Sequence, residues 1–473
     1  MNQASEPAGP APGDRLSTSV MLRYGVGMTG AQMFRDIPAA LLPVFMTTVL
    51  GIEAWVAGLV ILLPKAWVIF CDPLMGAWSD RRAPTTGRTP FLVAGAISTC
   101  VGFLALFTLT NIEPPLAAAA AVSLLFLLSM TGFSGFSVPY LAIAATLTRN
   151  PHERTKLLVY RLVFTSVGVI LGVGLAQPTV YWLGGGQRGW SAMAAIFAGV
   201  CLVSMLGSAI GLRPVLRQRP TPASAPQSLK RQFLAAWRNR PFRQLTVIHF
   251  IQTLATACQY TVIGMVFIYL VDGIELMPLY IFAMATCGIV MQPVWFRLSR
   301  RIGKISLFVW QCAAWCAVTV SWLAIDWGAN TQVALPMLGV TTLKDILIVV
   351  RGGLIGMANV GFILIVTSLF TDTVYLGEDG HGTTMEGSFA GLWSAIEKLA
   401  FALGPVVAGT ILSLSGYRAS KEGPVTQDPQ ALFGILANYS IVPFAFFVVS
   451  LLLVPRFARS VSAAEARRGA LSM

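Results

Sequence analysis

Long apolar stretches recur along the whole of this chain of 473 residues. Many exceed about 18 residues, the length at which an α-helix can cross a hydrocarbon core of roughly 30 Å. The composition agrees, because 55% of the residues are hydrophobic and only 11% are charged, whereas soluble domains carry about 25% charged residues. The sequence therefore predicts an all-α membrane protein that crosses the bilayer many times.

The apolar stretches divide into twelve expected spans, six in each half of the chain. One part is ambiguous, because residues 332–372 are too many for one helix and include Lys344, Asp345 and Arg351. We assign residues 334–347 to an external or interfacial segment. The expected spans cover residues 21–49, 55–78, 90–110, 116–147, 158–183, 190–212, 245–271, 279–298, 305–325, 348–370, 387–414 and 432–454.

Basic residues indicate the orientation of the chain. Lys and Arg concentrate in every second gap between spans, and the longest gap, residues 213–244, holds eight of them and no acidic residue. This is the positive-inside distribution, so we expect an inner-membrane protein with both termini in the cytoplasm. The net charge of +13 could suggest a nucleic-acid partner. The basic residues share no amphipathic face, however, and we expect no such partner.

The same pattern predicts the domain organisation. The N-terminal residues are rich in Pro, Ala and Ser and lack the apolar core of a signal peptide. The seven cysteines lie in apolar stretches without metal-ligand spacing, so we expect no metal or cofactor. The expected parts are a disordered cytoplasmic tail (1–19), an N-terminal six-helix bundle (20–212), a basic cytoplasmic linker (213–244), a C-terminal six-helix bundle (245–455) and a cytoplasmic tail (456–473).

A charged motif, "GAWSDRRAPTTGR", follows the second span. Gly76, Asp80, Arg81, Gly87 and Arg88 within it resemble the major facilitator signature, a G-x-x-x-D-R followed by G-R. In transporters with this motif the aspartate lies near the cytoplasmic start of the eleventh helix, whose partial positive charge favours an anion. The resemblance implies a latch at the inner gate, and an ordinary charged loop is the alternative.

The two halves of the chain also echo each other. "DPLMGAWSDRR" in the first half has a counterpart in "QPVWFRLSRRIGK" in the second. Each has a proline after a polar residue, then a serine and a basic pair. Two related six-helix halves joined by a long basic linker are the architecture of major facilitator transporters.

Five blocks resemble one family, in order along the chain. They are "YGVGMTG", "CDPLMGAWSDR", "VPYLAIAATLTRNPHERTKLLVYR", "TDTVYLGEDGHGTTMEG" and "WSAIEKLAFALG". These blocks are similar to those of the glycoside, pentoside and hexuronide cation symporters, the group that contains the melibiose permease. The resemblance implies the major facilitator fold and transport of a small solute together with a cation.

The resemblance also implies roles for charged residues. Asp72 matches one of the two aspartates of the second helix that bind the coupling cation, whereas Val68 stands at the other position. Lys65 stands where the family often has arginine, and Lys398 matches a lysine that faces the cation site. Asp72, Lys398 and Lys65 are therefore the candidate coupling residues.

The sugar-binding positions match less well. The acidic residues that bind sugar in the melibiose permease correspond to Gln32 and Ser137 here, and its stacking tryptophan corresponds to Leu141. We therefore do not expect a galactoside held as in that permease. The candidate substrate-binding residues, by resemblance or by spacing, are Gln32, Arg35, Asp36, Tyr140, Arg161 and Trp393.

The spacing of Lys65 and Asp72 predicts that both side chains lie on the same face of a helix. The two residues lie seven apart, and at 3.6 residues per turn they share one face of a helix. We expect both to point into one cavity and to find partners there, because buried charges need them; the candidates are Arg35, Asp36, Arg161 and Lys398. Neighbouring helical positions project about 100° apart, so we expect only one of Arg35 and Asp36 to face the cavity. A purely structural ion-pair cluster is the alternative to a functional site.

These observations predict a secondary transporter, not an enzyme. We expect cation-coupled symport of a small organic solute, a glycoside or another carbohydrate, by alternating access in a monomer. The alternative is a carrier of lysophospholipid or another amphiphile, which the apolar Leu141 and Val68 favour. We expect H⁺ as the coupling ion, because a proton needs one carboxylate whereas Na⁺ prefers several oxygen ligands.

Overall fold

The computed structural model describes residues 16–108, 112–148, 151–217, 237, 239–335, 339–376 and 386–471. Most of the predicted tail 1–19 and much of the linker 213–244 lie outside these residues. Within the described part, eleven helices are long and apolar enough to span a membrane. The helix of residues 18–48 adds a twelfth; its Gln32, Arg35 and Asp36 make it more polar than the others.

The N-terminal half holds six spanning helices, and the fifth is continuous through a π-helical turn. Their bounds are α1 (Thr18–Thr48), α2 (Ala54–Thr86), α3 (Thr89–Thr108), α4 (Pro115–Leu147), α5 (Pro151–Val169) with η1 (Ile170–Leu175) and α6 (Ala176–Trp182), and α7 (Gly186–Arg217).

The C-terminal half repeats this arrangement and adds a small hairpin. Its elements are α9 (Arg240–Met265) with η2 (Val266–Val271), α10 (Leu276–Ile302), α11 (Lys304–Ser321) with η3 (Trp322–Ala324), β1 (Gln332–Leu335), β2 (Gly339–Thr342), α12 (Leu343–Leu376), α13 (Glu386–Leu414), and α14 (Pro429–Leu436) with η4 (Ala437–Ile441) and α15 (Val442–Leu471).

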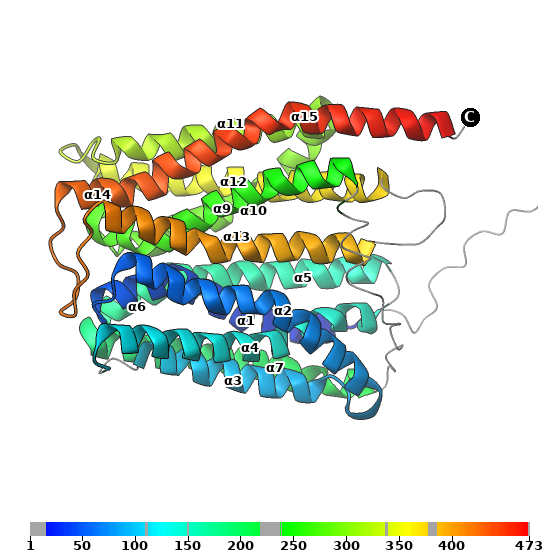
Figure 1. Ribbon diagram of the computed structural model, residues 1–473, viewed down its shortest axis with the longest axis horizontal. Coiled ribbons are helices and arrows are strands. Elements are labelled where there is room, and N and C mark those ends of the chain that lie inside the picture. The colour runs from blue at the N-terminus through cyan, green and yellow to red at the C-terminus, as the bar shows by residue number, and fades with distance from the viewer. Residues whose placement is uncertain are drawn as a thin grey trace, which may run out of the picture.

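The two halves lie side by side with their helices roughly parallel (Figure 1). α2 packs along α13 at the boundary, and α1 packs against α9 there. Gly51 and Gly87 lie at the two ends of α2, so we call the two ends of the bundle the Gly51 end and the Gly87 end. The predicted fold class, two six-helix halves of spanning helices, is confirmed.

Three helices continue beyond the expected membrane spans. α2 continues to Thr86, so Asp80 and Arg81 lie on the same helix as Gly76 and not in a loop. α15 likewise continues to Leu471, through most of the predicted tail. Bilayer thickness limits only the apolar part of a helix, and the charged turns beyond it remain helical in water. α7 also passes its predicted end and reaches Arg217.

α2 and α10, the helices that carry the echo between the halves, both end at a glycine. Each helix stops at a glycine, Gly87 with φ 72° and Gly303 with φ 82°. Such positive φ values are costly for residues with a Cβ, so glycine ends both helices at equivalent places. The next helix then begins at Thr89 in one half and Lys304 in the other.

The ambiguous stretch before α12 forms a β-hairpin and an early helix start. Strands β1 and β2 pair antiparallel, and α12 begins at Leu343, before the predicted Ile348. Thr342 and Asp345 fix this start, because Asp345 Oδ2 accepts from the Thr342 amide at 3.3 Å and Thr342 Oγ1 accepts from the Asp345 amide at 3.2 Å. This reciprocal pattern is a capping box.

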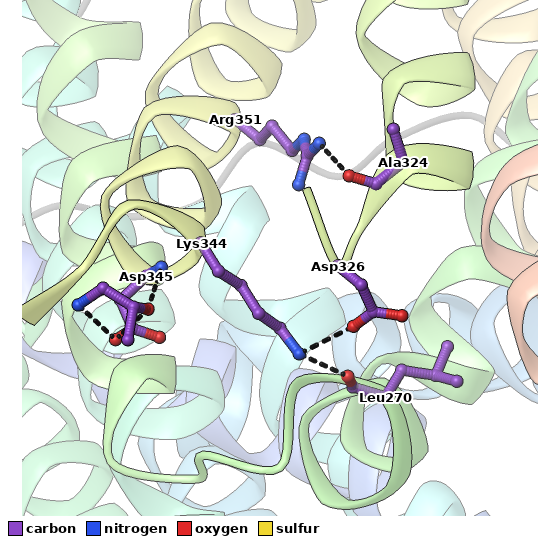
Figure 2. A network of polar contacts seen from close by, with 7 residues as sticks. Leu270, Ala324, Asp326, Lys344, Asp345 and Arg351 are labelled. Carbon is purple, nitrogen blue, oxygen red and sulfur yellow. Dashed lines mark hydrogen bonds and ion pairs between the residues drawn. The ribbon is translucent and has the colours of Figure 1, made fainter. Parts of the chain in front are cut away.

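The two basic residues of that stretch join helix ends (Figure 2). Lys344 donates to the Leu270 carbonyl at 3.2 Å and pairs with Asp326 at 3.0 Å. Arg351 donates to the carbonyls of Ser321 at 2.8 Å and Ala324 at 3.0 Å. Free carbonyls at the end of a helix carry partial negative charge, so both cations stabilise helix termini.

Hydrogen bonds close the boundary between the halves at the Gly51 end. Between α13 and α14 the chain crosses to the other half (Figure 1), and the amides of Ser420 and Gly423 donate to Thr47 and Thr48 carbonyls at 2.8 and 3.0 Å. Lys421 pairs with Glu113. These bonds satisfy carbonyls that α1 leaves free in its last turn.

Tyr417 adds a buried contact at the same end. Its hydroxyl lies 3.4 Å from Thr47 Oγ1 and 3.3 Å from the Tyr269 hydroxyl. Burial raises the pKa of Tyr417, so the phenol stays neutral and keeps its proton for hydrogen bonding. Between described residues, the hydrogen bonds and ion pairs that join the halves run from the middle of α2 to the Gly51 end, and none lies at the Gly87 end.

Glycines allow the close approach of α2 and α13 at the Gly51 end. A Cβ added to Gly58 would lie 2.5 Å from the Pro405 carbonyl oxygen, and one added to Gly409 would lie 2.2 Å from the Ala54 carbonyl oxygen. Such separations are far below van der Waals contact. A side chain at either position must push the two helices apart.

We therefore expect Gly58→Val to open the Gly51 end. In a background without the seven native cysteines, a probe Thr47→Cys should react faster with a water-soluble maleimide when Gly58→Val is present, because Thr47 is buried in the closed arrangement. Gly199→Val is the matched control, since a Cβ there meets nothing within 4 Å. An unchanged Thr47→Cys reaction rate would contradict this account of the closure.

Candidate functional site

One side chain in the middle of α1 faces accessible space. From Thr29 to Thr48 every residue is buried except Arg35, whose side chain is 60% exposed. α1 packs against helices of both halves, among them α5, α7 and α9. The exposure of Arg35 therefore reports a water-accessible space inside the bundle, between the halves.

Asp36, the next residue, is held in place within α1. Its carboxylate accepts from Gln32 Nε2 at 2.6 Å and from Arg35 Nε at 3.4 Å. Both Gln32 and Asp36 are buried, and the charge of Lys65 on α2 also acts on Asp36. The predicted choice between the two neighbours is thus resolved: Arg35 faces the space and Asp36 supports it.

Lys65 and Asp72 both reach α13, which confirms the prediction that they share a face of α2. Lys65 Nζ donates to the Phe401 carbonyl at 3.3 Å and lies 5.8 Å from the centre of its ring. Asp72 forms an ion pair with Lys398, and the two side chains are 17% and 35% exposed. Of the predicted partners of Asp72, Lys398 is the one that binds it.

The second oxygen of Asp72 has no such contact. Asp72 Oδ1 is buried and has no hydrogen-bond partner. Buried acceptors without a donor are uncommon and costly. The described residues therefore satisfy only one of the two Asp72 oxygens, the one that faces Lys398.

Sequence reasoning missed two residues of this site. Glu397 on α13 and Tyr260 on α9 both act electrostatically on Arg35 from the C-terminal half. Tyr260 also packs edge-on against Phe401, with ring centroids 6.2 Å apart. An acidic residue inside an apolar span was a usable signal for Glu397; a tyrosine in a long apolar helix carries no comparable signal.

Two other candidate substrate-binding residues are aromatic and stack on a second ring. Tyr140 is buried, stacks on Tyr24 with centroids 4.6 Å apart, and donates to the Tyr24 carbonyl. Trp393 stacks on His249 with centroids 4.0 Å apart. Tyr140 and Trp393 each pack on a ring of their own half, and Trp393 is half-buried; their predicted role in substrate binding stays a prediction.

Arg161 and the positions that differ from the melibiose permease vary in their burial. Arg161 on α5 is half-buried and acts electrostatically on Tyr140. Val68 is buried, whereas Leu141 is 48% exposed. Ser137 is half-buried. Val68 therefore does not line the accessible space, which removes one of the two observations that favoured an amphiphile.

The gating motif forms a contact within the N-terminal half. Asp80 accepts from Arg88 at 2.6 Å, while Arg81 is exposed and a Cβ at Gly76 would lie 3.3 Å from Val138. Between described residues no hydrogen bond or ion pair joins Asp80 to the start of α13. The segment before α13, where the predicted latch partner would lie, falls outside the described residues, so the latch stays a prediction.

The fold and the site are those of a membrane transporter: two six-helix halves meet at an ion pair, and charged groups of both halves act on the exposed Arg35. The chain matches the family described as MFS/sugar transport protein over residues 23–458. It therefore belongs to this family of the major facilitator superfamily, and it is a transporter and not an enzyme. The predicted resemblance to glycoside and cation symporters is confirmed.

Curated relatives match almost the whole chain. The inner membrane symporter YicJ of Escherichia coli K12 is 25% identical over 452 residues, which cover 93% of this chain and 92% of that one. The isoprimeverose transporter of Lactiplantibacillus pentosus is 25% identical, with 94% and 90% covered. A putative sulfoquinovose importer of Salmonella typhimurium LT2 is 24% identical, with 94% and 90% covered.

Solved structures of transporters share the fold. A bacterial homologue of the iron transporter ferroportin, in an inward-facing state, superposes with a TM-score of 0.66 at 15% identity and covers 93% of this chain and 98% of that one. The nucleoside transporter NupG superposes with a TM-score of 0.58 at 15% identity, covering 94% and 99%. At these identities the likeness establishes the fold alone.

The ion pair between α2 and α13 predicts a non-additive pattern of stability. Asp72→Asn or Lys398→Met alone should lower the free energy of unfolding by about 1–2 kcal/mol, less than the roughly 3–5 kcal/mol of a fully buried pair because both groups keep some access to water. The double variant should recover most of that loss, because no unpaired charge remains. Thermal unfolding in detergent measures this, and additive losses would contradict it.

Proposed function

We propose that this protein is a cation-coupled symporter of a sugar or glycoside that works by alternating access. The observation that carries the proposal is the Asp72–Lys398 ion pair, which joins the two halves within their spanning helices. A cation that binds to Asp72 competes with Lys398 for the carboxylate and so weakens the ion pair between the halves. Movement of one half against the other then couples that binding to transport.

The proposed coupling ion is H⁺. Val68 stands at the position of the family's second acid and is buried. α2 therefore supplies few oxygen ligands near Asp72. Na⁺ prefers several oxygen ligands, whereas a proton needs only the open Asp72 Oδ1. Proton binding would neutralise Asp72 and release Lys398, which loosens the contact between α2 and α13.

The proposed orientation places the Gly87 end in the cytoplasm, because basic residues flank the spans on that side. The closed Gly51 end then faces outward, and the described chain is in an inward-facing conformation. In this orientation Asp80 lies at the inner gate, where it can contact the start of α13 after the halves close. The carrier acts as a monomer in the inner membrane.

Orientation is tested by labelling single cysteines in intact cells. In a cysteine-free background we expect Glu422→Cys, in the segment that closes the Gly51 end, to react with a membrane-impermeant maleimide. Pro226→Cys, in the basic linker, should react only after the cells are permeabilised, since positive loops stay inside. Reaction of Pro226→Cys in intact cells would reverse the proposed topology.

Coupling is tested by Asp72→Asn in proteoliposomes. The amide resembles a protonated carboxyl and cannot release a proton, so we expect loss of uphill accumulation while exchange down a substrate gradient stays measurable. Asp80→Asn is a control that lies outside the coupling site and should still accumulate substrate, at a lower rate. Accumulation by Asp72→Asn, or wild-type uptake that requires Na⁺ and ignores a proton uncoupler, would refute proton coupling.

A further inference from the structure

The guanidinium group of Arg35 is the part of the site that is left open to a ligand. Within the described part of the chain, its hydrogen bonding is limited to Nε, which donates to Asp36 Oδ1 at 3.4 Å. The two terminal nitrogens bind no described residue, and the side chain is 60% exposed at mid-helix. A guanidinium edge of this kind fits a carboxylate, sulfonate or phosphate by two parallel hydrogen bonds.

The other charged groups around Arg35 already have partners. Lys398 binds Asp72, Lys65 donates to the Phe401 carbonyl, and Asp36 accepts from Gln32 at 2.6 Å. Arg35 is the most exposed of these three cations, since Lys65 and Lys398 are half-buried, and its two terminal nitrogens form a planar pair of donors that an ammonium lacks. A neutral sugar would leave the two terminal nitrogens of this guanidinium without a charged partner inside the membrane, which is unfavourable.

Glu397 faces Arg35 from the other half of the protein. The Glu397 charge acts on Arg35, but the two form no ion pair in this conformation, and Glu397 is half-buried. Tyr260 stands beside them on α9 and also acts on Arg35. Glu397 is thus placed as the negative charge that balances Arg35 across the empty space.

We propose that the substrate is a sugar carrying an acidic group, and that Arg35 binds this group. The inference rests on the proposed function and adds the substrate class. Arg35, Lys65 and Lys398 balance Asp36, Asp72 and Glu397 in the empty site. An anion adds one negative charge to that balanced set, so it enters together with a cation, which symport supplies.

Binding to the purified wild-type protein tests the substrate class without any substitution. The ligands are matched pairs that differ in one group: glucuronate and glucose, galacturonate and galactose, glucose 6-phosphate and glucose, and 6-deoxy-6-sulfoglucose and glucose. In at least one pair we expect the anion to bind at least about tenfold more tightly, the effect of one or two charge-assisted hydrogen bonds. The acid group of that pair identifies the preferred anion.

The outcomes separate this inference from the proposed function. If the neutral member binds as tightly as the anion in every pair, or no anion binds, the inference is wrong. Uptake of a neutral sugar alone in proteoliposomes would overturn the inference and leave sugar symport intact. Uptake of no member of any pair would count against both.

Variants then test the role of Arg35. Arg35→Gln should abolish the preference for the anion, and Arg35→Lys should keep part of it, because an ammonium retains charge but not the planar fork. Arg35→Gln with Asp36→Asn covers the case in which an unpaired Asp36 impairs folding. Glu397→Gln should strengthen binding of the anion, since it removes the opposing charge.

Arg23→Gln is the matched control on the same helix. Arg23 donates to the Gly211 carbonyl at 3.2 Å near the Gly87 end of α1, far from the space between the halves, so its loss should leave the preference unchanged. Retention of the full anion preference by Arg35→Gln, or its equal loss in Arg23→Gln, would overturn the assignment of Arg35.

Discussion

The ion pair between Asp72 and Lys398 joins the two halves inside their spanning helices. A lone charge in the middle of a spanning helix is unfavourable, so each residue depends on the other half of the protein for its partner. Lys65, two helical turns before Asp72, likewise finds its partner in the other half, since its ammonium donates to the Phe401 carbonyl. α2 and α13 are therefore held together by polar contacts that neither half can satisfy alone, and the site exists only where the halves meet.

The rest of the boundary is asymmetric about this pair. Toward the Gly51 end, backbone amides of Ser420 and Gly423 bind the last carbonyls of α1, and glycines bring α2 and α13 into backbone contact. A neutral hydrogen bond contributes only about 0.5–1.5 kcal/mol net, so a few such bonds close one end without locking it. Asp80, which instead binds Arg88 in its own half, remains available for the opposite closure. The Asp72–Lys398 pair has weak hydrogen bonds between the halves toward the Gly51 end. This arrangement suits a carrier whose two ends open and close in turn.

The candidate site was predicted in part. The spacing of Lys65 and Asp72 was enough to place both on one face, and the lysine of the eleventh span was identified as a partner. Tyr140 and Trp393 were expected near the substrate; each stacks on a ring of its own half, Tyr24 or His249, and their role in substrate binding stays a prediction. Glu397 and Tyr260 were overlooked because their importance lies in Arg35, which belongs to a helix more than two hundred residues away in the chain. Spacing along one helix reveals shared faces, but not which face of a distant helix lies opposite.

The sequence by itself determined the class of this protein, because apolar length and the distribution of basic residues depend only on local composition and on the bilayer. It also determined the two related halves, which the glycines ending α2 and α10 repeat. Tertiary structure decided which charges are paired and which are open. Arg35 and Asp36 are neighbours in the chain, yet one is exposed and the other buried. The physical reason is that adjacent helical residues project about 100° apart, and the packing of α1 against both halves selects which of them faces the space between the halves.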